Sequence, residues 1–291
     1  MNCNLCPRKC NTERETHVGY CMSDAVFRVC RCAPHMWEEP VLSGTRGAGT
    51  VFFSGCNLGC VYCQNKVISR NGQAGRAVDG DALLDMMLRL ADTGVHCIEL
   101  VTPTHHTHSL VKVLEELRKR CTLPTVWNSS AYESVETLAC LDGLIDVYLP
   151  DFKYADAALA KKYSNAKDYP DVALAAIREM YRQSGKVTFD SDGLIRKGVI
   201  IRHLVLPTHR KNSLSALDML AEAVPVTDVR LSLMSQYTPE FTDAQKYPEL
   251  SRRVTSFEYN SVVKRAIELG FDGYFQERSS ASSEYTPDFE V

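Results

Sequence analysis

The strongest constraint on the fold is the alternation, from about residue 50 onward, of short apolar runs with longer amphipathic stretches. We expect strands at the apolar runs, which cover residues 50–53, 97–101, 125–127, 145–149, 199–206 and 229–233. We expect helices at the amphipathic stretches, which cover residues 79–94, 107–120, 133–140, 155–163, 170–184, 213–223 and 255–269. Six β–α units in a row favour parallel strands joined by right-handed crossovers. Because a closed barrel of this kind has eight units, we expect an α/β fold with a partial (β/α)6 barrel.

The first 45 residues do not share this alternation and are rich in cysteine. We therefore expect two parts. Residues 1–45 would be a cysteine-rich, metal-binding N-terminal segment, and residues 46–291 would be the barrel domain.

The overall composition is that of an ordinary globular protein, with 45% hydrophobic and 24% charged residues. The net charge of -3 provides no broad positive field, so bulk binding of nucleic acid is disfavoured. No apolar run approaches the roughly 20 residues of a membrane helix. The first ten residues, MNCNLCPRKC, lack the apolar core of a signal peptide, so we expect a cytoplasmic protein without a membrane partner.

Twelve cysteines are many for a cytoplasmic chain of this length, and in a reducing compartment they serve metals more often than disulfides. Most of them lie in three groups, at residues 3–21, 30–32 and 56–63. Cys97, Cys121 and Cys140 are isolated among apolar or strand-like neighbours, and we interpret those three as packing residues.

The central motif is a C-x3-C-x2-C loop, formed by Cys56, Cys60 and Cys63 directly after the first expected strand. The same spacing lies on one face of a helix, but Gly55 and Gly59 disfavour a helix here. A four-iron cluster needs four ligands, so three thiolates leave one iron open to a small molecule. Zinc held by three cysteines and water is the rival, although the loop contains no histidine or carboxylate to complete such a site.

With an aromatic residue, Tyr62, before its third cysteine, this loop resembles the signature of the radical S-adenosylmethionine (SAM) superfamily. The resemblance implies a 4Fe–4S cluster whose open iron binds the amino and carboxylate groups of SAM. It also implies an anaerobic reaction in which an electron donor such as flavodoxin or ferredoxin reduces the cluster. SAM is then cleaved to methionine and a 5′-deoxyadenosyl radical. The implied fold is a partial (β/α)6 barrel, and Tyr62 would lie near the adenine.

Beyond the loop, the chain is similar to the family named after the pyruvate formate-lyase activating enzyme, and most closely to its activating-enzyme-like subgroup. The similar segments are CPRKC, HMWEEP, SGTRGAGTVFFSGCN, LVTPTHHT, NSSAYE, LPDFKY, IRHLVLP and LMSQYTP. Active sites of β/α barrels lie at the C-terminal ends of the strands, so we expect these segments to face one mouth.

The resemblance also implies cofactor-binding residues. Asp151 and Lys153 match an Asp-x-Lys pair that holds the methionine part of SAM, although a surface ion pair is the alternative interpretation. The positions that match other cofactor- or substrate-facing residues are Asn128, Ser129, Arg202 and His203. The superfamily usually binds the SAM amino group with a Gly-Gly-Glu motif, and here residues 102–105 (TPTH) stand at that position. The hydroxyls of Thr102 and Thr104, together with backbone carbonyls, would then bind the amino group.

We expect four residues to line the mouth and contact the substrate: His105, His203, Gln236 and Tyr237. Ordinary loop polarity is the alternative for each of them. A three-histidine metal site including His106 and His108 is disfavoured, because adjacent side chains point in different directions.

The N-terminal cysteines Cys3, Cys6, Cys10 and Cys21 provide enough ligands for a second metal centre. A zinc site and an auxiliary iron–sulfur cluster both satisfy the count. We favour zinc, because a closed site fixes a short segment that has no core of its own. Cys30 or Cys32 could replace a member of the set.

Three classes of function follow from these patterns. The first is radical chemistry on a small molecule, and the subgroup includes a queuine lyase, which trims queuine to a simpler 7-deazaguanine. The second is an activase that places a glycyl radical on a partner enzyme. The third is a non-catalytic iron–sulfur or zinc module, which leaves the polar motifs at the predicted strand ends unexplained. We favour the first, with a 7-deazapurine base as substrate.

Overall fold

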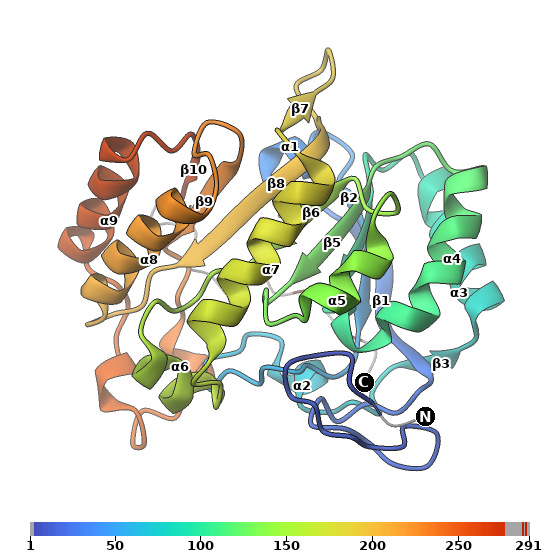
Figure 1. Cartoon of the computed structure of the whole chain (residues 1–291), viewed down its shortest axis with the longest axis horizontal. Coiled ribbons are helices and arrows are strands. Elements are labelled where there is room, and N and C mark those ends of the chain that lie inside the picture. Colours follow the sequence, from blue (N-terminus) through green and yellow to red (C-terminus); the bar gives the residue numbers. More distant parts are fainter. Residues whose placement is uncertain (1–2, 277–286, 288, 290–291) are drawn as a thin grey trace.

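The computed structural model of the chain describes residues 3–276, 287 and 289 (Figure 1). Within these residues the strands form one sheet in the order β10-β9-β8-β6-β5-β4-β2-β1-β3, and β7 (Thr188–Phe189) pairs with β8. The parallel strands are β2 (Ala48–Phe53), β4 (Ile98–Val101), β5 (Thr125–Ser129), β6 (Val147–Pro150), β8 (Ile195–Leu204), β9 (Arg230–Met234) and β10 (Gly273–Phe275). The order has two ends, β10 and β3, so the sheet is open.

This topology confirms the predicted fold class. The six expected strands correspond to β2, β4, β5, β6, β8 and β9, and each pairs in parallel with its neighbour in the sheet. The sequence did not reveal β10, which extends the parallel sheet beyond β9 by only three residues.

The N-terminal part of the chain also contributes to the sheet. Strand β1 (Phe27–His35) pairs antiparallel with β2 on one side and with β3 (Arg76–Val78) on the other. The sequence predicts residues 27–35 within an N-terminal segment outside the barrel, whereas the structure includes them in the sheet. Arg28 and Arg31 interrupt the apolar pattern of this strand, and an antiparallel strand has no β–α repeat to mark it. The boundary at residue 45 stays a prediction.

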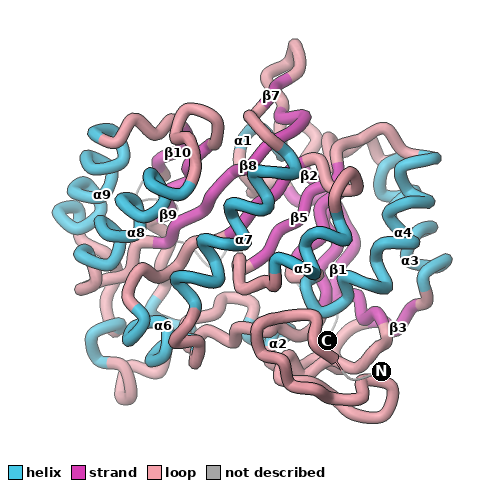
Figure 2. Tube along the Cα trace, in the orientation of Figure 1, coloured by secondary structure: helices cyan, strands magenta, loops and turns pink. Residues whose placement is uncertain are grey.

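Helices cover the sheet, as Figure 2 shows for α7 in front of the central strands. The longer helices are α3 (Gly80–Asp92), α4 (Thr107–Arg120), α6 (Ala157–Ser164), α7 (Tyr169–Ser184), α8 (Arg210–Ala223) and α9 (Ser256–Glu268). The short ones are α1 (Pro40–Ser43), α2 (Lys66–Ser69) and α5 (Val135–Leu138), with 3-10 turns at η1 (Thr104–His106), η2 (Ala139–Leu141), η3 (Pro239–Phe241) and η4 (Pro248–Leu250).

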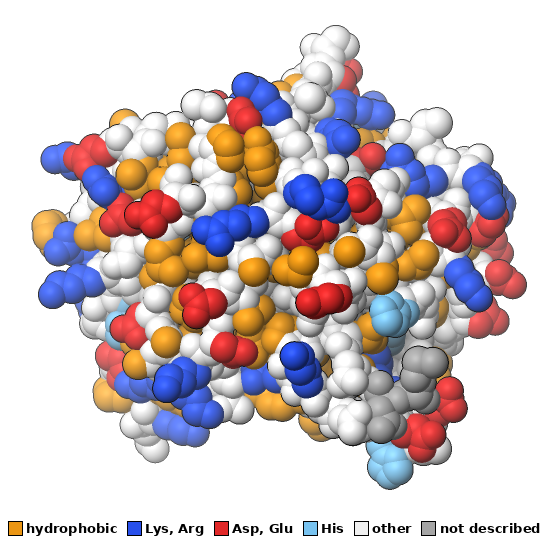
Figure 3. All heavy atoms as spheres, in the orientation of Figure 1, with side chains coloured by type: hydrophobic (Ala, Val, Ile, Leu, Met, Phe, Trp, Pro, Cys, Tyr) orange, Lys and Arg blue, Asp and Glu red, His pale blue; other side chains and the backbone are white. Residues whose placement is uncertain are grey.

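The core explains why these segments form these elements. Every residue of β2, β4, β5 and β6 is buried, as expected for parallel strands that are covered on both faces. Helix α3 buries Leu83, Met87 and Leu90, which recur at the spacing of one helical face. In the described residues, no helix has the length and apolarity needed to cross a bilayer. On the face shown in Figure 3, basic and acidic side chains are interspersed.

Candidate active site

One cavity of about 310 Å³ connects the cysteine loop with the inner face of the barrel. The residues predicted as site residues that line it are Cys56, Cys60, Tyr62, Cys63, Thr102, Asn128, Ser129, Asp151, Lys153, Arg202, Gln236 and Tyr237. They come from the ends of β2, β4, β5, β6, β8 and β9. The C-terminal ends of parallel strands meet at one edge, which is why residues so far apart in sequence share this cavity.

The cysteine loop follows β2 and presents its thiols to the cavity. The Cys60 sulfur accepts a hydrogen bond from the Ser164 hydroxyl at 3.0 Å, and the Cys63 sulfur lies 3.4 Å from the Ser69 hydroxyl. Burial, reinforced by the neighbouring Cys60 and Cys56 thiols, raises the pKa of Cys63 to about 12. Burial also raises the pKa of Cys60, although Lys153 opposes the shift.

These thiols fit an iron–sulfur cluster by the chemistry of the donor set. Three partly buried thiols on one short loop are the kind of ligands that a cation stabilises as thiolates. In the part of the chain that the structure describes, however, no three His, Cys, Asp or Glu side chains already have the arrangement of a metal site.

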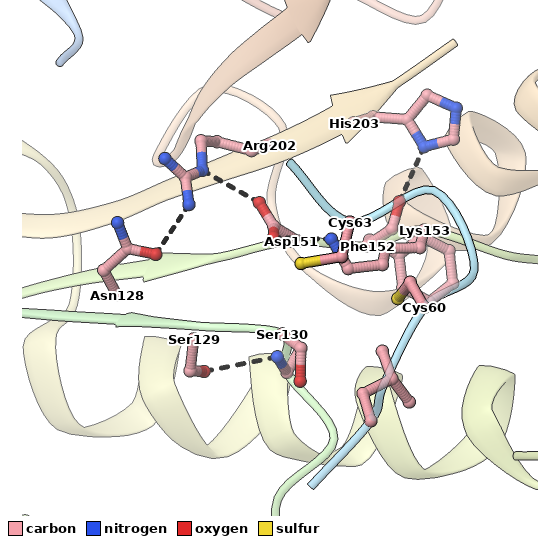
Figure 4. Close-up of polar contacts among 12 residues, drawn as sticks. Cys60, Cys63, Asn128, Ser129, Ser130, Asp151, Phe152, Lys153, Arg202 and His203 are labelled. Carbon is pink, nitrogen blue, oxygen red and sulfur yellow. Dashed lines mark hydrogen bonds and ion pairs between the residues drawn. The ribbon is translucent and has the colours of Figure 1, made fainter. Parts of the chain in front are cut away.

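A buried network of charges lies beside the loop (Figure 4). Arg202 donates from Nε to Asp151 at 2.8 Å and from Nη2 to the Asn128 side-chain oxygen at 2.6 Å. It also forms an ion pair with Glu38 at 3.3 Å. Lys153 donates to the other Asp151 oxygen at 2.7 Å.

The Asp151 carboxylate is therefore held between two cations. Burial opposes its ionisation, but Arg202 and Lys153 outweigh that effect and lower the pKa of Asp151 below its usual range. The side chains of Asp151 and Lys153 are each 16% exposed. The pair lies in the cavity wall, so the interpretation as a solvated surface ion pair does not describe it.

The structure does not bring His203 into the cavity. Arg202 and His203 are neighbours on β8, and successive side chains of a strand point to opposite faces. His203 is fully buried behind the cavity wall, where its Nδ1 lies 2.6 Å from the Phe152 carbonyl oxygen (Figure 4). Burial lowers the pKa of His203 to about 4.

His105 and Thr104 also lie outside the cavity. His105 is buried in η1, with its Nε2 2.8 Å from the Ser54 carbonyl oxygen, and burial lowers its pKa to about 3. Thr104 donates to Glu133 at 2.9 Å. Of the threonines in this segment, Thr102 lines the cavity, with the positive φ of 57° that turns the chain after β4.

The polar groups of Tyr62, Tyr237 and Gln236 in the cavity already form hydrogen bonds with other residues of the chain. The Tyr62 hydroxyl lies 2.7 Å from that of Tyr154, and the Tyr237 hydroxyl donates to the Leu250 carbonyl oxygen at 2.7 Å. The Gln236 side-chain oxygen accepts from Gln276 at 3.3 Å. Tyr237 therefore offers the cavity its ring and not its hydroxyl.

Sequence reasoning missed the carboxylates of the cavity. Glu38 and Glu39 line it, and Glu99 on β4 accepts a hydrogen bond from the Asn128 side-chain amide at 2.6 Å. Burial raises the pKa of all three, that of Glu39 to about 7. Both Glu38 and Glu39 belong to the segment HMWEEP, but two adjacent glutamates in a sequence do not indicate that their side chains are buried.

The four N-terminal cysteines lie close together. A side chain at Gly19 would meet the Cys10 sulfur at 3.2 Å and the Cys21 sulfur at 3.6 Å. Burial, with Cys21 and Cys3 contributing, raises the pKa of Cys6 to about 11. The segment adjoins the central loop directly, because the Cys56 amide donates to the Cys21 carbonyl oxygen at 3.1 Å.

Comparison with known proteins defines the class. The model of the radical SAM superfamily matches residues 50–197, and the chain belongs to this superfamily. It is 30% identical over 282 residues to "Uncharacterized protein MJ0674" of Methanocaldococcus jannaschii, covering 92% of this chain and 74% of the relative.

Solved structures show the same fold at low identity. SuiB of Streptococcus suis, bound to its precursor peptide SuiA, is 14% identical with a TM-score of 0.52, over 76% of this chain and 46% of SuiB. Methylornithine synthase (PylB) is 14% identical with a TM-score of 0.50, over 89% of this chain and 66% of PylB. The chain thus spans about half the length of SuiB. Membership of the superfamily implies SAM-dependent radical chemistry with a 4Fe–4S cluster.

Proposed function

We propose that the chain uses SAM to abstract a hydrogen atom from a small molecule held in the cavity. The observation that carries this proposal is the continuity of one cavity from the thiols of Cys56, Cys60 and Cys63 to the buried network around Arg202. The three cysteines would hold the 4Fe–4S cluster, which when bound supplies the electron that cleaves SAM.

Residues of the chain would bind and orient SAM. The Lys153 ammonium would attract the carboxylate of its methionine part, and Asp151 holds that ammonium in place at 2.7 Å. Asn128, Ser129 and Thr102 line the same wall and offer polar groups to the remainder of the cofactor. The ring of Tyr62, which is 7% exposed, would cover the adenine and exclude water.

The substrate we propose is a 7-deazapurine base such as queuine, cleaved in a lyase reaction. The cavity supports a small planar substrate because it combines apolar walls with polar groups, which fix the orientation of such a ligand. The relevant residues include Phe53 and Leu204 among the apolar ones and Gln236 among the polar ones. A base would be held against the cofactor at the distance that hydrogen transfer requires.

The experiment is anaerobic incubation of the reconstituted protein with SAM, dithionite and queuine or related 7-deazapurines. Mass spectrometry would measure 5′-deoxyadenosine and the products. We expect a purine-like molecule to raise 5′-deoxyadenosine formation above the uncoupled background, and a Cys63→Ala variant to abolish it. If no such molecule does so, and a co-expressed glycyl-radical enzyme gains a glycyl signal in electron paramagnetic resonance, the chain is an activase.

We also propose that Cys3, Cys6, Cys10 and Cys21 hold a structural zinc ion. The proximity of their sulfurs and the lack of a large apolar core in residues 3–21 support this. Metal analysis separates zinc from an auxiliary iron–sulfur cluster, as described in the Discussion.

A further inference from the structure

Two glutamates from the segment after β1 also line the cavity, next to Arg202. Strand β1 is antiparallel to β2 and its last residue, His35, pairs with the first residue of β2, Ala48. The segment that carries Glu38 and Glu39 therefore leaves β1 where the parallel strands begin, and the Glu38 side chain reaches Arg202 inside the barrel. Both residues line the same cavity as the cysteines.

Glu39 has an acceptor with no partner. The residue is 8% exposed, and its Oε2 is buried without a hydrogen bond in the described structure. The neighbouring Glu38 side chain is 9% exposed and pairs with Arg202. A buried polar atom without a partner costs free energy, so its persistence indicates a place for a ligand.

The balance of charge around these glutamates is acidic. Four carboxylates belong to the network, those of Glu38, Glu39, Glu99 and Asp151, against the two cations Arg202 and Lys153. Both cations are already engaged by Asp151. The group that completes the network is therefore one that donates hydrogen bonds and carries positive charge.

We propose that the substrate carries a protonated amine, which binds to Glu39 and Glu38 in the wall of the cavity. The amine would fix the substrate at one end, so that its other end lies toward the cysteine loop. The inference uses the cavity of the proposed function and adds the class of group that it recognises.

Ionisation of the glutamates fits this assignment. Burial raises the pKa of Glu39 to about 7, against the influence of Arg202, with Glu38 adding to the shift. A bound ammonium would favour the carboxylate form and recover the free energy that burial of an unpaired charge costs. A neutral ligand would gain no such advantage.

The test compares two probes that share a bicyclic ring and differ in one group. Tryptamine carries an ammonium, and tryptophol carries a hydroxyl in its place. Binding to the reconstituted enzyme with SAM present would be measured by calorimetry near pH 8. We expect tryptamine to bind at least about tenfold more tightly than tryptophol, a preference that Glu39→Gln reduces to about threefold or less.

Two further variants make the result specific. Glu39→Asp keeps the charge and should retain most of the preference, which also guards against a Glu39→Gln variant that does not fold. Glu116→Gln removes an exposed glutamate on α4 and should leave the preference unchanged. Equal binding of the two probes by the unmodified enzyme, or a preference that survives in a folded Glu39→Gln variant, overturns the inference.

The result is independent of the proposed substrate. If tryptamine is preferred through Glu39 but no 7-deazapurine raises 5′-deoxyadenosine formation, the amine site stands and the queuine proposal fails. If a 7-deazapurine is cleaved but tryptamine is not preferred, the queuine proposal stands and the amine site fails.

Discussion

At the scale of single residues, Arg202 organises the candidate site. Its guanidinium reaches Asp151, Asn128 and Glu38, which come from three segments far apart in sequence. A buried charge network of this kind constrains geometry more than it adds stability, because removing one member leaves the others unpaired in a medium of low dielectric. The positions of the polar groups in the cavity are thus linked to one another.

Replacement of Lys153 by alanine tests the binding of SAM. Because a hydrogen bond to a charged group contributes ~1.5–3 kcal/mol, we expect the dissociation constant of SAM to rise about tenfold or more. The absorbance of the iron–sulfur cluster should not change, since Lys153 provides no ligand to iron. Isothermal titration of the reconstituted protein measures the first quantity and visible spectroscopy the second.

Lys162→Ala is the matched control, because Lys162 pairs with Glu249 at the surface and is 50% exposed. It should bind SAM as the unmodified protein does. An unchanged dissociation constant in Lys153→Ala would mean that the Asp151–Lys153 pair serves the structure of the cavity wall alone.

The stability of the protein should depend on pH through Glu39. Burial raises the pKa of Glu39 from 4.5 to about 7, so the folded chain keeps this proton to a higher pH than the unfolded chain does. The free energy of unfolding therefore falls as the pH rises from about 4.5 to 7, by at most about 1.4 kcal/mol per pH unit for one group. The glutamine side chain in Glu39→Gln does not titrate, so the free energy of unfolding of this variant should not fall in this way between about pH 4.5 and 7.

Urea unfolding of the two proteins near pH 5 and near pH 7.5 measures the effect. The variant should gain stability relative to the unmodified protein at the higher pH. A difference between the two proteins that is the same at both pH values would contradict the assignment.

The residues of the cavity were predictable where a motif or a strand end marked them. Cys56, Asp151 and Arg202 lie where the sequence indicated. His203 does not, because it follows Arg202 directly on β8 and so points to the opposite face of the strand. Glu39 was missed as a site residue since its burial depends on the antiparallel pairing of β1, which is a tertiary feature.

At the scale of elements, hydrophobic periodicity located the helices and parallel strands closely. The helix expected at residues 107–120 is α4 with the same bounds, and the helix expected at 133–140 is α5 followed by η2. The exceptions are short or antiparallel elements. Three residues in β10 are too few for a pattern, and the apolar run of β1 is interrupted by Arg28 and Arg31.

Helix α9 offers a test at this scale. The Thr255 hydroxyl accepts from the Glu258 amide, and the Glu258 carboxylate accepts from the Thr255 amide at 2.9 Å, which together form a capping box. Thr255→Ala should lower the free energy of unfolding by about 1 kcal/mol. Thr255→Ser keeps the hydroxyl and should lose much less, as measured by chemical denaturation. If the two variants lose the same free energy of unfolding, the threonine methyl group, and not the hydrogen bond of the cap, provides the stabilisation.

At the scale of the whole molecule, the N-terminal segment and the barrel form one structure around the cysteine loop. Arg8 donates to the carbonyl oxygens of Asn57 and Leu58 in that loop and of Ser164 and Asn165 at the C-terminal end of α6. Its guanidinium also lies 3.9 Å from the centre of the Tyr20 ring. In Figure 1 the loops that precede β1 lie below the barrel, next to α2.

Metal analysis of a variant without the central cysteines tests the N-terminal centre. In the triple variant Cys56→Ala, Cys60→Ala and Cys63→Ala, we expect the brown iron–sulfur absorbance to be lost and about one zinc ion per chain to remain. Residual iron with sulfide would instead indicate an auxiliary cluster. If neither metal is present in significant amount, residues 3–21 hold no metal centre.

The contacts of Arg8 also bear on the order of events during biosynthesis. Two of its acceptors, Ser164 and Asn165, are separated from it by 156 and 157 positions along the chain. A ribosome that adds ~5–20 residues per second exposes Arg8 many seconds before these partners exist. The contacts of Arg8 with Asn57 and Leu58 span only 49 and 50 positions, so they become possible much earlier. The N-terminal residues can therefore meet the cysteine loop well before the partners at the end of α6 have been synthesised.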